Sequence, residues 1–539
     1  MTTVAPTVPR VVARRRRYRL RAPFGLSLGG LVVAAAFALP FGYLVWHTLA
    51  IGTRYFDILA DENVAGPLRR TIILATTVSL GATTVGTALA WLLTRTDLPG
   101  RRFWRVAVPL PLVIPSFVGA FALLAAFTRG GLIDSIVGFD TFPRIEGLWA
   151  AWLVLTLLTY PYVYLPVAAR LETLPRSLEE SARALGRAPR EVFRTVVLPQ
   201  TSGAMWAGAL LVFLYCLAEF GAVQLLHYDT LTRAIFSAWG QDRDVTLALS
   251  LLLGAIALVV VLGERRIARR RVQTEAISPS SRVVQNELGP WKAPAFVFVT
   301  TVVALALAVP VAVLAHWTAR GIFGTATLHA GDLVRPTVTT AALGVVTAFV
   351  AVAAVLPVAF LTVRYRSAPG EAANAVVVSG FALPGLVIAI SIVFFVLQWP
   401  ALADRAYQTW GLLVFAYVVH FGSQSLRAAQ VAVGAVPRRV EDAARSLGAG
   451  RVRRLVTVQI PLMRSGLLAG GGLVLLSAMK ELPATLVLSP TGTRTLATEI
   501  WTSRSEGFFA EAGLASLVLL ALSGVLTWLL VIRPARARA

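Results

Sequence analysis

The chain has 539 residues, of which 57% are hydrophobic and 14% charged, with a mean hydropathy of +0.72 and a formal net charge of +23. This hydropathy excludes an ordinary soluble domain, because most of the chain must have lipid as its solvent. The single cysteine, Cys216, excludes an intrachain disulfide and a cysteine metal site, and we interpret it as a small core residue.

The positive charge does not indicate nucleic-acid binding, because the basic residues stand in short stretches beside apolar runs. Residues 1–24 form a basic tail before the first apolar run, and no convincing cleavage site follows that run. We therefore interpret the tail as the cytoplasmic start of a membrane protein and not as a signal peptide. The expected contacts are with a lipid bilayer and with no nucleic acid.

Twelve apolar runs are long enough to cross a bilayer, which needs about 20 residues for each helix. The sequence therefore predicts an all-α membrane protein with about twelve transmembrane helices. The expected spans are 26–49, 71–93, 105–127, 148–169, 203–226, 245–263, 294–316, 338–362, 375–397, 409–430, 463–487 and 512–532.

Loop charges predict the orientation of these spans. Arginines gather in the tail 1–24, in the loop after the second span, in the segment 264–292 and after the last span. The positive-inside rule puts all four, and both termini, in the cytoplasm. The loops expected on the opposite side are richer in acid: Asp57, Asp61, Glu62, Asp134, Asp140, Asp229, Asp242 and Asp244.

One polar pattern occurs twice, in residues 175–199 and 437–461, which we call the first and second charged loops. The first copy consists of Glu180, Ser181, Ala182, Gly186, Leu198 and Pro199. The second consists of Asp442, Ala443, Ala444, Gly448, Ile460 and Pro461, each 262 positions further on. The orientation rule puts both loops in the cytoplasm.

Each charged loop has the pattern of a helix, a glycine turn and a second short helix. Leu178, Ala182 and Leu185 have helical spacing and are expected on one face. Gly186 stands where a helix ends in a left-handed residue, and Pro199 is expected to end the second helix. The recurrence of this spacing in both halves favours docking on a partner over a solvated surface loop.

The repeat extends into the apolar runs. Pro115 matches Pro384, and Glu219 matches Glu481 at the same offset of 262. Six spans in each half is an even number, so both halves enter the membrane in the same direction and form parallel repeats. The expected division is a first repeat at 25–263, a cytoplasmic linker at 264–292, a second repeat at 293–533 and a cytoplasmic tail at 534–539.

The two charged loops resemble the signature of permease subunits of binding-protein-dependent ABC importers, and the resemblance covers nearly the whole chain as two fused permease domains. It implies that the charged loops are coupling helices for two copies of an ATPase subunit. It also implies an extracytoplasmic binding protein as partner and a place in the bacterial inner membrane. Ser181 stands for the usual first alanine and Asp442 for the usual glutamate.

The chain has no phosphate-binding loop of its own, because such a loop needs lysine followed by serine or threonine. Lys292 is followed by Ala293, and Lys480 by Glu481. We therefore expect a transport subunit with no catalytic residue and no bound cofactor. ATP and Mg²⁺ would be bound by a partner chain, or the energy would come from an ion gradient.

The ionisable residues expected at membrane depth include Glu219, Lys480 and Glu481. Charge at membrane depth usually faces a cavity or a partner, so these residues are candidates for the translocation path. A structural role at the outer end of the helices has equal weight. Pairing of Lys480 with Glu219 across the two repeats is a further hypothesis.

The stretches MKELPATLVLSPTGTRTLATEIW and AEFGAVQLL resemble ferric-iron permeases, with thiamine importers as the near alternative. The resemblance implies that the tight iron site belongs to the binding protein. Acidic outer loops suit a hard cation, but such loops are usually only solvated surface. The five histidines show no metal-site spacing, so no metal site is expected in this chain.

Two other classes compete with this interpretation. A secondary transporter driven by an ion gradient can also have parallel six-helix repeats, but it has no need of two equivalent docking loops. A membrane-embedded enzyme is the weaker alternative, because no paired-acid, serine–histidine or histidine-rich metal pattern is present.

Overall fold

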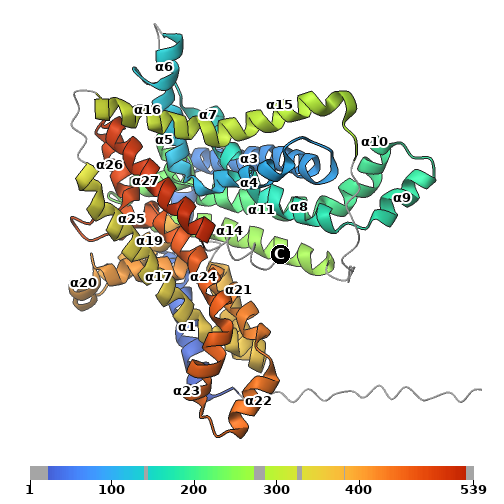
Figure 1. Cartoon of the computed structure of the whole chain (residues 1–539). Coiled ribbons are helices and arrows are strands. Elements are labelled where there is room, and N and C mark those ends of the chain that lie inside the picture. Colours follow the sequence, from blue (N-terminus) through green and yellow to red (C-terminus); the bar gives the residue numbers. More distant parts are fainter. Residues whose placement is uncertain (1–21, 139–143, 272–285, 324–329, 381–382, 530–539) are drawn as a thin grey trace, which may run out of the picture.

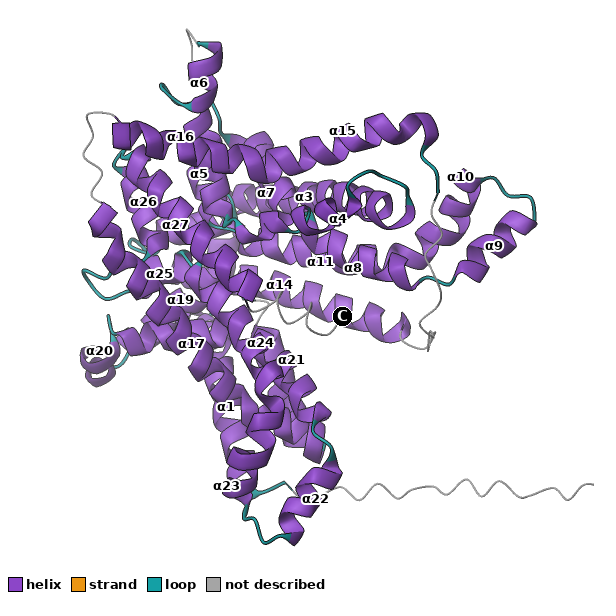
Figure 2. Ribbon diagram, in the orientation of Figure 1, coloured by secondary structure: helices purple, strands orange, loops and turns teal. Residues whose placement is uncertain are grey.

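The computed structural model describes residues 22–138, 144–271, 286–323, 330–380 and 383–529. Within these ranges the chain is almost entirely helical, with one isolated bridge between Thr96 and Asn286 in place of any sheet (Figure 2). The basic tail before residue 22, Asp140, and the arginines after residue 529 lie outside the described residues. The all-α fold predicted from the apolar runs is confirmed.

The first half begins with α1 and ends with α14. Its elements are α1 (Phe24–Ile51), α2 (Arg54–Ala60), α3 (Glu62–Arg95), α4 (Arg101–Ala107), η1 (Leu110–Val113), α5 (Ser116–Phe127), α6 (Leu132–Val137), α7 (Gly147–Thr159), α8 (Pro161–Thr173), α9 (Arg176–Ala184), α10 (Pro189–Val192), η2 (Phe193–Val197), α11 (Leu198–Ala218), α12 (Gly221–Leu225), α13 (Leu231–Ala238) and α14 (Arg243–Arg271).

The second half repeats the same order. Its elements are η3 (Gly289–Trp291), α15 (Lys292–Val303), η4 (Ala304–Ala308), α16 (Val309–Phe323), η5 (Ala330–Leu333), α17 (Val334–Phe360), η6 (Leu361–Tyr365), α18 (Ala368–Gly380), α19 (Gly385–Leu397), α20 (Pro400–Ala406), α21 (Trp410–Ala435), α22 (Arg438–Ser446), α23 (Arg451–Arg454), η7 (Leu455–Gln459), α24 (Ile460–Met479), α25 (Pro483–Leu488), α26 (Leu496–Ser505) and α27 (Phe509–Thr527).

Ten helical segments of the described chain are long and apolar enough to cross a membrane, and the bent pair α18–α19 would make eleven. The remaining predicted span corresponds to α21, a 26-residue helix that is not among them. α21 packs between α17 and α24, so its polar side chains meet protein. Gln424 accepts a hydrogen bond from Ser477 at 3.1 Å, and Gln430 donates to Asn374 at 2.8 Å.

The third and ninth predicted spans are not continuous helices, and this expectation from the sequence was wrong. The chain is extended at Pro115 (ψ 145°) before α5 and at Pro384 (ψ 143°) before α19. α18 and α19 meet at an angle of 109°. Proline has no backbone N–H and disfavours the helical conformation in the residue before it, so both helices restart at the proline.

The two halves exchange their opening helices. α1 packs on α17, α18 and α19 of the second half, whereas α16 packs on α5 of the first half. In Figure 1 the helices form two arms that join near α16, α25 and α26. One arm ends at α9 and α10, and the other ends at α22 and α23, so both charged loops point away from the junction. This arrangement agrees with two parallel repeats.

Glycines allow close helix contacts at matched places in the two arms. A Cβ atom at Gly208 of α11 would lie 2.7 Å from the Cα atom of Val163 in α8. A Cβ atom at Gly470 of α24 would lie 2.7 Å from the Cβ atom of Ala428 in α21. Small residues of this kind let membrane helices pack by direct backbone contact.

We predict that Gly208→Ala and Gly470→Ala each lower the free energy of unfolding by about 1–3 kcal/mol, because the added methyl group forces the helices apart. Gly208→Ala should be the worse, since the neighbouring atom belongs to the backbone. The control is Gly42→Ala in α1, where nothing lies within 4 Å of the added Cβ. Thermal unfolding in detergent, followed by tryptophan fluorescence, measures the difference. Equal midpoints for Gly208→Ala and Gly42→Ala would contradict the packing described.

Candidate functional site

Both charged loops have the helix–turn–helix shape that their spacing predicts. α9 and α22 are nine-residue helices, and each ends at a glycine in the left-handed region, Gly186 (φ +81°) and Gly448 (φ +77°). The N–H of Arg187 bonds the carbonyl of Ala182 at 3.3 Å, and that of Ala449 bonds Ala444 at 3.0 Å. These bonds satisfy helix-end carbonyls in the pattern of a glycine-terminated helix.

The surface of each loop differs from the predicted face. Leu185 is 80% exposed and Leu447 is 87% exposed, so Leu185 does not share a buried face with Ala182. The reason is that Leu185 follows the last residue of α9, where the chain turns away from helical geometry. Each loop therefore presents a large apolar side chain to the outside immediately before its glycine, and others are exposed elsewhere in the loops, among them Leu178 (39%) and Val452 (75%).

The other pattern residues divide into an exposed set and a buried set. Ala182 and Ala444 are buried, and Leu198 is half-buried. The exposed residues are Glu180, Ser181, Gly186, Pro199, Asp442, Ala443, Gly448, Ile460 and Pro461. An exposed face of small and acidic residues beside an exposed leucine is a suitable contact surface for another protein.

The sequence suggested that Pro199 and Pro461 end the second helix of each loop. In the structure they do not. α10, η2 and α11 run on without a break, as do α23, η7 and α24. The segments η2 and η7 are single π-helical stretches directly before each proline. The wider π turn leaves room where a proline ring would otherwise clash with the preceding turn.

Two ion pairs, one buried and one partly buried, attach the charged loops to the membrane helices, and sequence reasoning missed both. Arg95 at the end of α3 pairs with Glu179 of α9 at 2.8 Å, with side chains 1% and 3% exposed. Arg364 of η6 pairs with Glu441 of α22, also at 2.8 Å, with side chains 12% and 18% exposed. The signal was present, since Glu179 and Glu441 differ by the same offset of 262 and directly precede the pattern.

The arginines also bind backbone carbonyls of the preceding helices. Arg95 donates to the carbonyl of Leu171 at 2.6 Å, and Arg364 donates to that of Val436 at 2.6 Å. Each guanidinium therefore joins one membrane helix, the end of the membrane helix that leads into the charged loop, and the loop itself. A fork of rigid donors suits this role, because one side chain can hold several acceptors.

Glu219 and Glu481 lie at breaks between helices and not within continuous spans. α11 ends at Ala218, and the chain is extended at Glu219 (ψ 125°) before the short helix α12. α24 ends at Met479, and Glu481 stands before α25. The predicted spans 203–226 and 463–487 are therefore interrupted, the first at Glu219 and the second at Lys480 and Glu481.

Each of these glutamates accepts hydrogen bonds at the start of the next short helix. One carboxylate oxygen of Glu219 accepts from the N–H of Ala222 at 2.8 Å and from the hydroxyl of Ser116 at 2.9 Å. Glu481 accepts from the N–H of Ala484 at 3.1 Å. Free N–H groups at a helix start carry partial positive charge, so a carboxylate is favourable there.

The two sites differ where the repeats differ. Ser116 is the first residue of α5, and its counterpart at the start of α19 is Gly385. A Cβ atom at Gly385 would lie 2.6 Å from a carboxylate oxygen of Glu481, so glycine is needed there. His420 of α21 also faces Glu481, with its ring nitrogen 4.0 Å from the second carboxylate oxygen.

Lys480 reaches from the second repeat into the first. Its ammonium donates to the carbonyl of Leu112, in η1, at 3.0 Å. No ion pair joins Lys480 to Glu219 in the part of the chain that the structure describes, so the pairing hypothesis was wrong. The reason is that Glu219 is already held by donors of its own repeat, whereas η1 offers Lys480 a carbonyl near a helix break.

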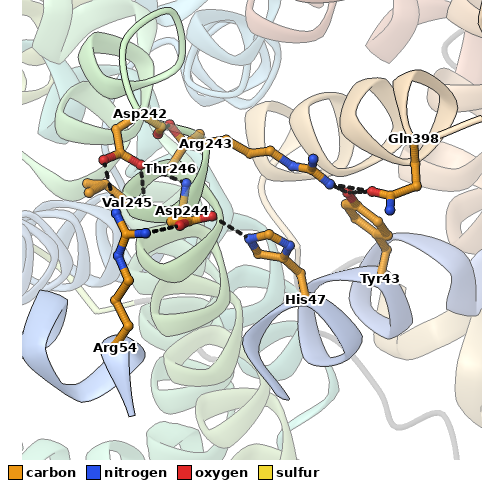
Figure 3. A network of polar contacts seen from close by, with 9 residues as sticks. All are labelled: Tyr43, His47, Arg54, Asp242, Arg243, Asp244, Val245, Thr246 and Gln398. Carbon is orange, nitrogen blue, oxygen red and sulfur yellow. Dashed lines mark hydrogen bonds and ion pairs between the residues drawn. The ribbon is translucent and has the colours of Figure 1, made fainter. Parts of the chain in front are cut away.

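A polar network at the junction of the arms was also missed at the sequence level (Figure 3). Asp244, near the start of α14, lies 3.1 Å from the ring of His47 in α1 and 2.7 Å from Arg54 of α2. Asp242 accepts from the N–H of Asp244 at 2.8 Å and so caps α14. These contacts join the start of α14 to the end of α1.

The same network continues into the second repeat through Arg243. Its guanidinium donates to the amide oxygen of Gln398 at 2.5 Å and to the hydroxyl of Tyr43 (Figure 3). Gln398 directly follows α19, whereas Arg243 opens α14. Arg243 therefore joins α1 and α14 of the first repeat to the residue that follows α19 in the second.

The described residues contain no group of three or more histidine, cysteine, aspartate or glutamate side chains able to hold a metal ion. The chemistry of the molecule thus lies in two exposed loops, two ion pairs that hold them, and a set of polar groups at helix breaks. Together these features define a membrane protein of two repeats, each with one exposed charged loop.

Comparison with known proteins identifies the family. The family model for "binding-protein-dependent transport system inner membrane component" matches residues 82–273 and 356–533, one copy in each half. The chain belongs to this family and is a permease subunit of an ABC importer. It is a multi-pass membrane protein of the transport-subunit class.

The relatives with assigned substrates include one that matches nearly the whole chain and others that match about a third of it. The chain is 32% identical to the "Fe(3+)-transport system permease protein FbpB 2" of Haemophilus influenzae over 95% of its own length and 98% of the relative. It is 33% identical to the sulfate permease CysT of Salmonella typhimurium over 37% of its length and 73% of the relative. The molybdenum permease ModB of Mycobacterium tuberculosis is 32% identical over 37% of the chain and 80% of the relative.

We predict that Glu219→Ala lowers the free energy of unfolding by about 1–3 kcal/mol, because it leaves the Ser116 hydroxyl and the Ala222 N–H without an acceptor. Glu219→Gln keeps an acceptor oxygen and should cost clearly less. Glu180→Ala, on the exposed face of α9, is the control and should change nothing. Thermal unfolding in detergent gives the comparison. If Glu219→Gln were as damaging as Glu219→Ala, the capping role of the side chain would be wrong.

Proposed function

We propose that this permease passes ferric iron, delivered by an extracytoplasmic binding protein, into the cytoplasm. The observation that carries this proposal is the end-to-end match with the Fe(3+) permease of Haemophilus influenzae, which has the same double length. The matches with sulfate and molybdenum permeases extend over about a third of the chain. Import of an oxyanion is the second candidate on that ground, and thiamine is the alternative left by the sequence.

We infer that the charged loops are coupling helices, each docked on one copy of an ABC ATPase subunit. The support is their common shape, their exposed small and acidic residues, and the exposed Leu185 and Leu447 that precede the glycines. An apolar side chain that is exposed and flanked by polar residues is typical of an anchor for a partner pocket. Two equivalent loops favour two copies of one ATPase, which would bind the ATP and Mg²⁺.

The proposed orientation puts both charged loops and both termini in the cytoplasm of a bacterial inner membrane. The loop charges support this, as does the placement of both loops at the free ends of the two arms (Figure 1). The arms diverge toward the charged loops (Figure 1).

Glu219, Lys480 and Glu481 remain our candidates for the translocation path. They stand at helix breaks near the contact between the repeats, and Lys480 crosses that contact. Lys480 is the member best suited to sense a passing charge, because the hydrogen bond of its ammonium in the described residues is to a neutral carbonyl. Glu219 and Glu481 accept hydrogen bonds from the N–H groups at the starts of α12 and α25. Their proposed role is therefore to stabilise the backbone beside the path.

We predict that Gly186→Leu combined with Gly448→Leu leaves the protein inserted but uncouples transport from ATP hydrolysis. Leucine strains a backbone held at φ near +80°, so the turn and the docked helix shift. The matched control is asparagine at both positions, which tolerates this region. Transport and ATPase rates in liposomes with the partner subunits give the readout. Normal import by the leucine variant would show that the coupling assignment is wrong.

We predict that an iron-loaded binding protein stimulates the ATPase activity of the complex in liposomes severalfold. Matched preparations loaded with thiamine, sulfate or molybdate should not do so. Empty binding proteins are the controls for each arm. Stimulation by the thiamine-loaded or an oxyanion-loaded protein alone would overturn the iron proposal and leave the importer class intact.

A further inference from the structure

The segment that precedes α15 is attached to the cytoplasmic end of α3 in the proposed orientation. The N–H of Asn286 donates to the carbonyl of Arg95 at 2.8 Å, and the N–H of Asp97 donates to the carbonyl of Asn286 at 3.3 Å. These two bonds form the isolated bridge between Thr96 and Asn286. We call residues 286–292, from this bridge to the start of α15, the clasp.

The side chain of Asn286 extends this contact to the first charged loop. Its amide oxygen accepts a hydrogen bond from the guanidinium of Arg183, in α9, at 2.6 Å. Its amide nitrogen donates a hydrogen bond to the carbonyl of Arg95 at 3.3 Å. One residue therefore contacts both the end of a membrane helix and the loop that carries the docking surface.

The clasp lies over the buried ion pair that holds the same loop. Arg95 binds Glu179 of α9 with its side chain and Asn286 with its backbone carbonyl. Arg95 and Glu179 are 1% and 3% exposed, against 12% and 18% for Arg364 and Glu441 in the second repeat. The first charged loop is thus held by a buried ion pair and by the exposed hydrogen bond from Arg183 to Asn286.

Asp97 anchors the other end of the clasp. One carboxylate oxygen accepts from the N–H of Leu288 at 3.0 Å, and the other lies 2.9 Å from the ammonium of Lys292. The hydrogen bond from Lys292 holds the pKa of Asp97 below its ordinary value. A lowered pKa means that the contact contributes at neutral pH and is lost only as acid protonates the carboxylate.

The matching position of the second loop has a different partner. Arg445 occupies in α22 the place that Arg183 occupies in α9, 262 positions earlier. Arg445 pairs with Asp442 on its own helix at 3.7 Å, and both side chains are about two-thirds exposed. The two loops have the same shape but are held by different contacts, so substitutions at the matched arginines form a natural comparison.

We propose that the clasp is a positioning element for coupling, which links the first charged loop to the opening helix of the second repeat. This inference rests on the proposed coupling function of the loops and deepens it. When α15 shifts, residues 286–292 carry the displacement to α9 through the bonds of Asn286. Asn286 and Asp97 are positioning residues, since they act through Arg183 and the backbone of Arg95.

The test measures the number of substrate molecules imported for each ATP hydrolysed, in liposomes that contain the full chain, its ATPase and its iron-loaded binding protein. Asn286→Ala should lower this ratio about threefold to tenfold, the range expected for one charge-assisted hydrogen bond. Arg183→Ala should lower it by a similar factor. The double variant should be no worse than either single variant, because both remove the same contact.

Glu287→Ala, next to Asn286 in the clasp, is the control and should leave the ratio within about twofold of the wild type, since this side chain is exposed and makes no hydrogen bond or ion pair with the described residues. Arg183→Lys keeps a donor and should restore part of the loss. A merely structural defect would lower import and hydrolysis together and leave the ratio unchanged. Should Asn286→Ala fail to assemble, Asp97→Asn provides the second variant, since it removes the ionic anchor of the clasp while the bridge at Asn286 remains.

Two results separate this inference from the function on which it rests. A wild-type complex whose ATPase activity never responds to the loaded binding protein would overturn the proposed function. A wild-type complex that responds, with Asn286→Ala and Asp97→Asn showing the wild-type ratio, would overturn the clasp alone. Equal losses from Asn286→Ala and Glu287→Ala would also overturn it, because the Glu287 side chain makes no hydrogen bond or ion pair with the described residues.

Discussion

A chain surrounded by hydrocarbon must satisfy every backbone polar group from within, and this constraint governs where polar side chains occur in the molecule. Helices that break at Pro115 and after Ala218 expose N–H groups at membrane depth. Glu219 and Ser116 supply the missing partners there, and Glu481 does the same at the equivalent break in the second repeat. The charged residues inside the membrane are therefore first of all the groups that make broken helices tolerable.

The two repeats meet this constraint with different side chains. Ser116 at the start of α5 corresponds to Gly385 at the start of α19, and Lys480 corresponds to Ala218. Lys480 crosses from the second repeat to the first, where it binds the carbonyl of Leu112. A permease of two identical chains would have the same side chain on both sides of such a path. Fusion of the two domains into one chain allows each side to carry its own residue.

The ion pairs at the charged loops show how a surface loop can be held firmly against a membrane helix. Burial of Arg95 and Glu179 has a large desolvation cost, which is offset only when the geometry is good and further hydrogen bonds are present. The bond from Arg95 to the Leu171 carbonyl supplies one of these. Such a pair fixes the orientation of the loop, which matters more for coupling than any contribution to stability. A movement of the partner bound to α9 would reach α3 and α8 directly.

Local patterns in the sequence were sufficient for much of this structure. The apolar runs define a helical membrane protein, and the spacing around Gly186 and Gly448 predicts a glycine-terminated helix in each loop, because helix ends depend on neighbouring residues. The repeat at an offset of 262 indicates two equivalent halves. These features follow from contacts between residues that are close in the chain, so periodicity and composition are enough to find them.

Only the tertiary structure decided which of these residues meet. Arg95 and Glu179 are far apart in the chain, as are Lys480 and Leu112, and nothing in their local spacing pairs them. Pro115 and Pro384 are compatible with either a kinked or an interrupted helix, and in the folded chain the helix is interrupted at both. Leu185 has the spacing of a buried residue but is exposed, since the helix has already ended. Long-range contacts depend on how the two arms are packed together, and that packing is a property of the whole chain that no single stretch of sequence contains.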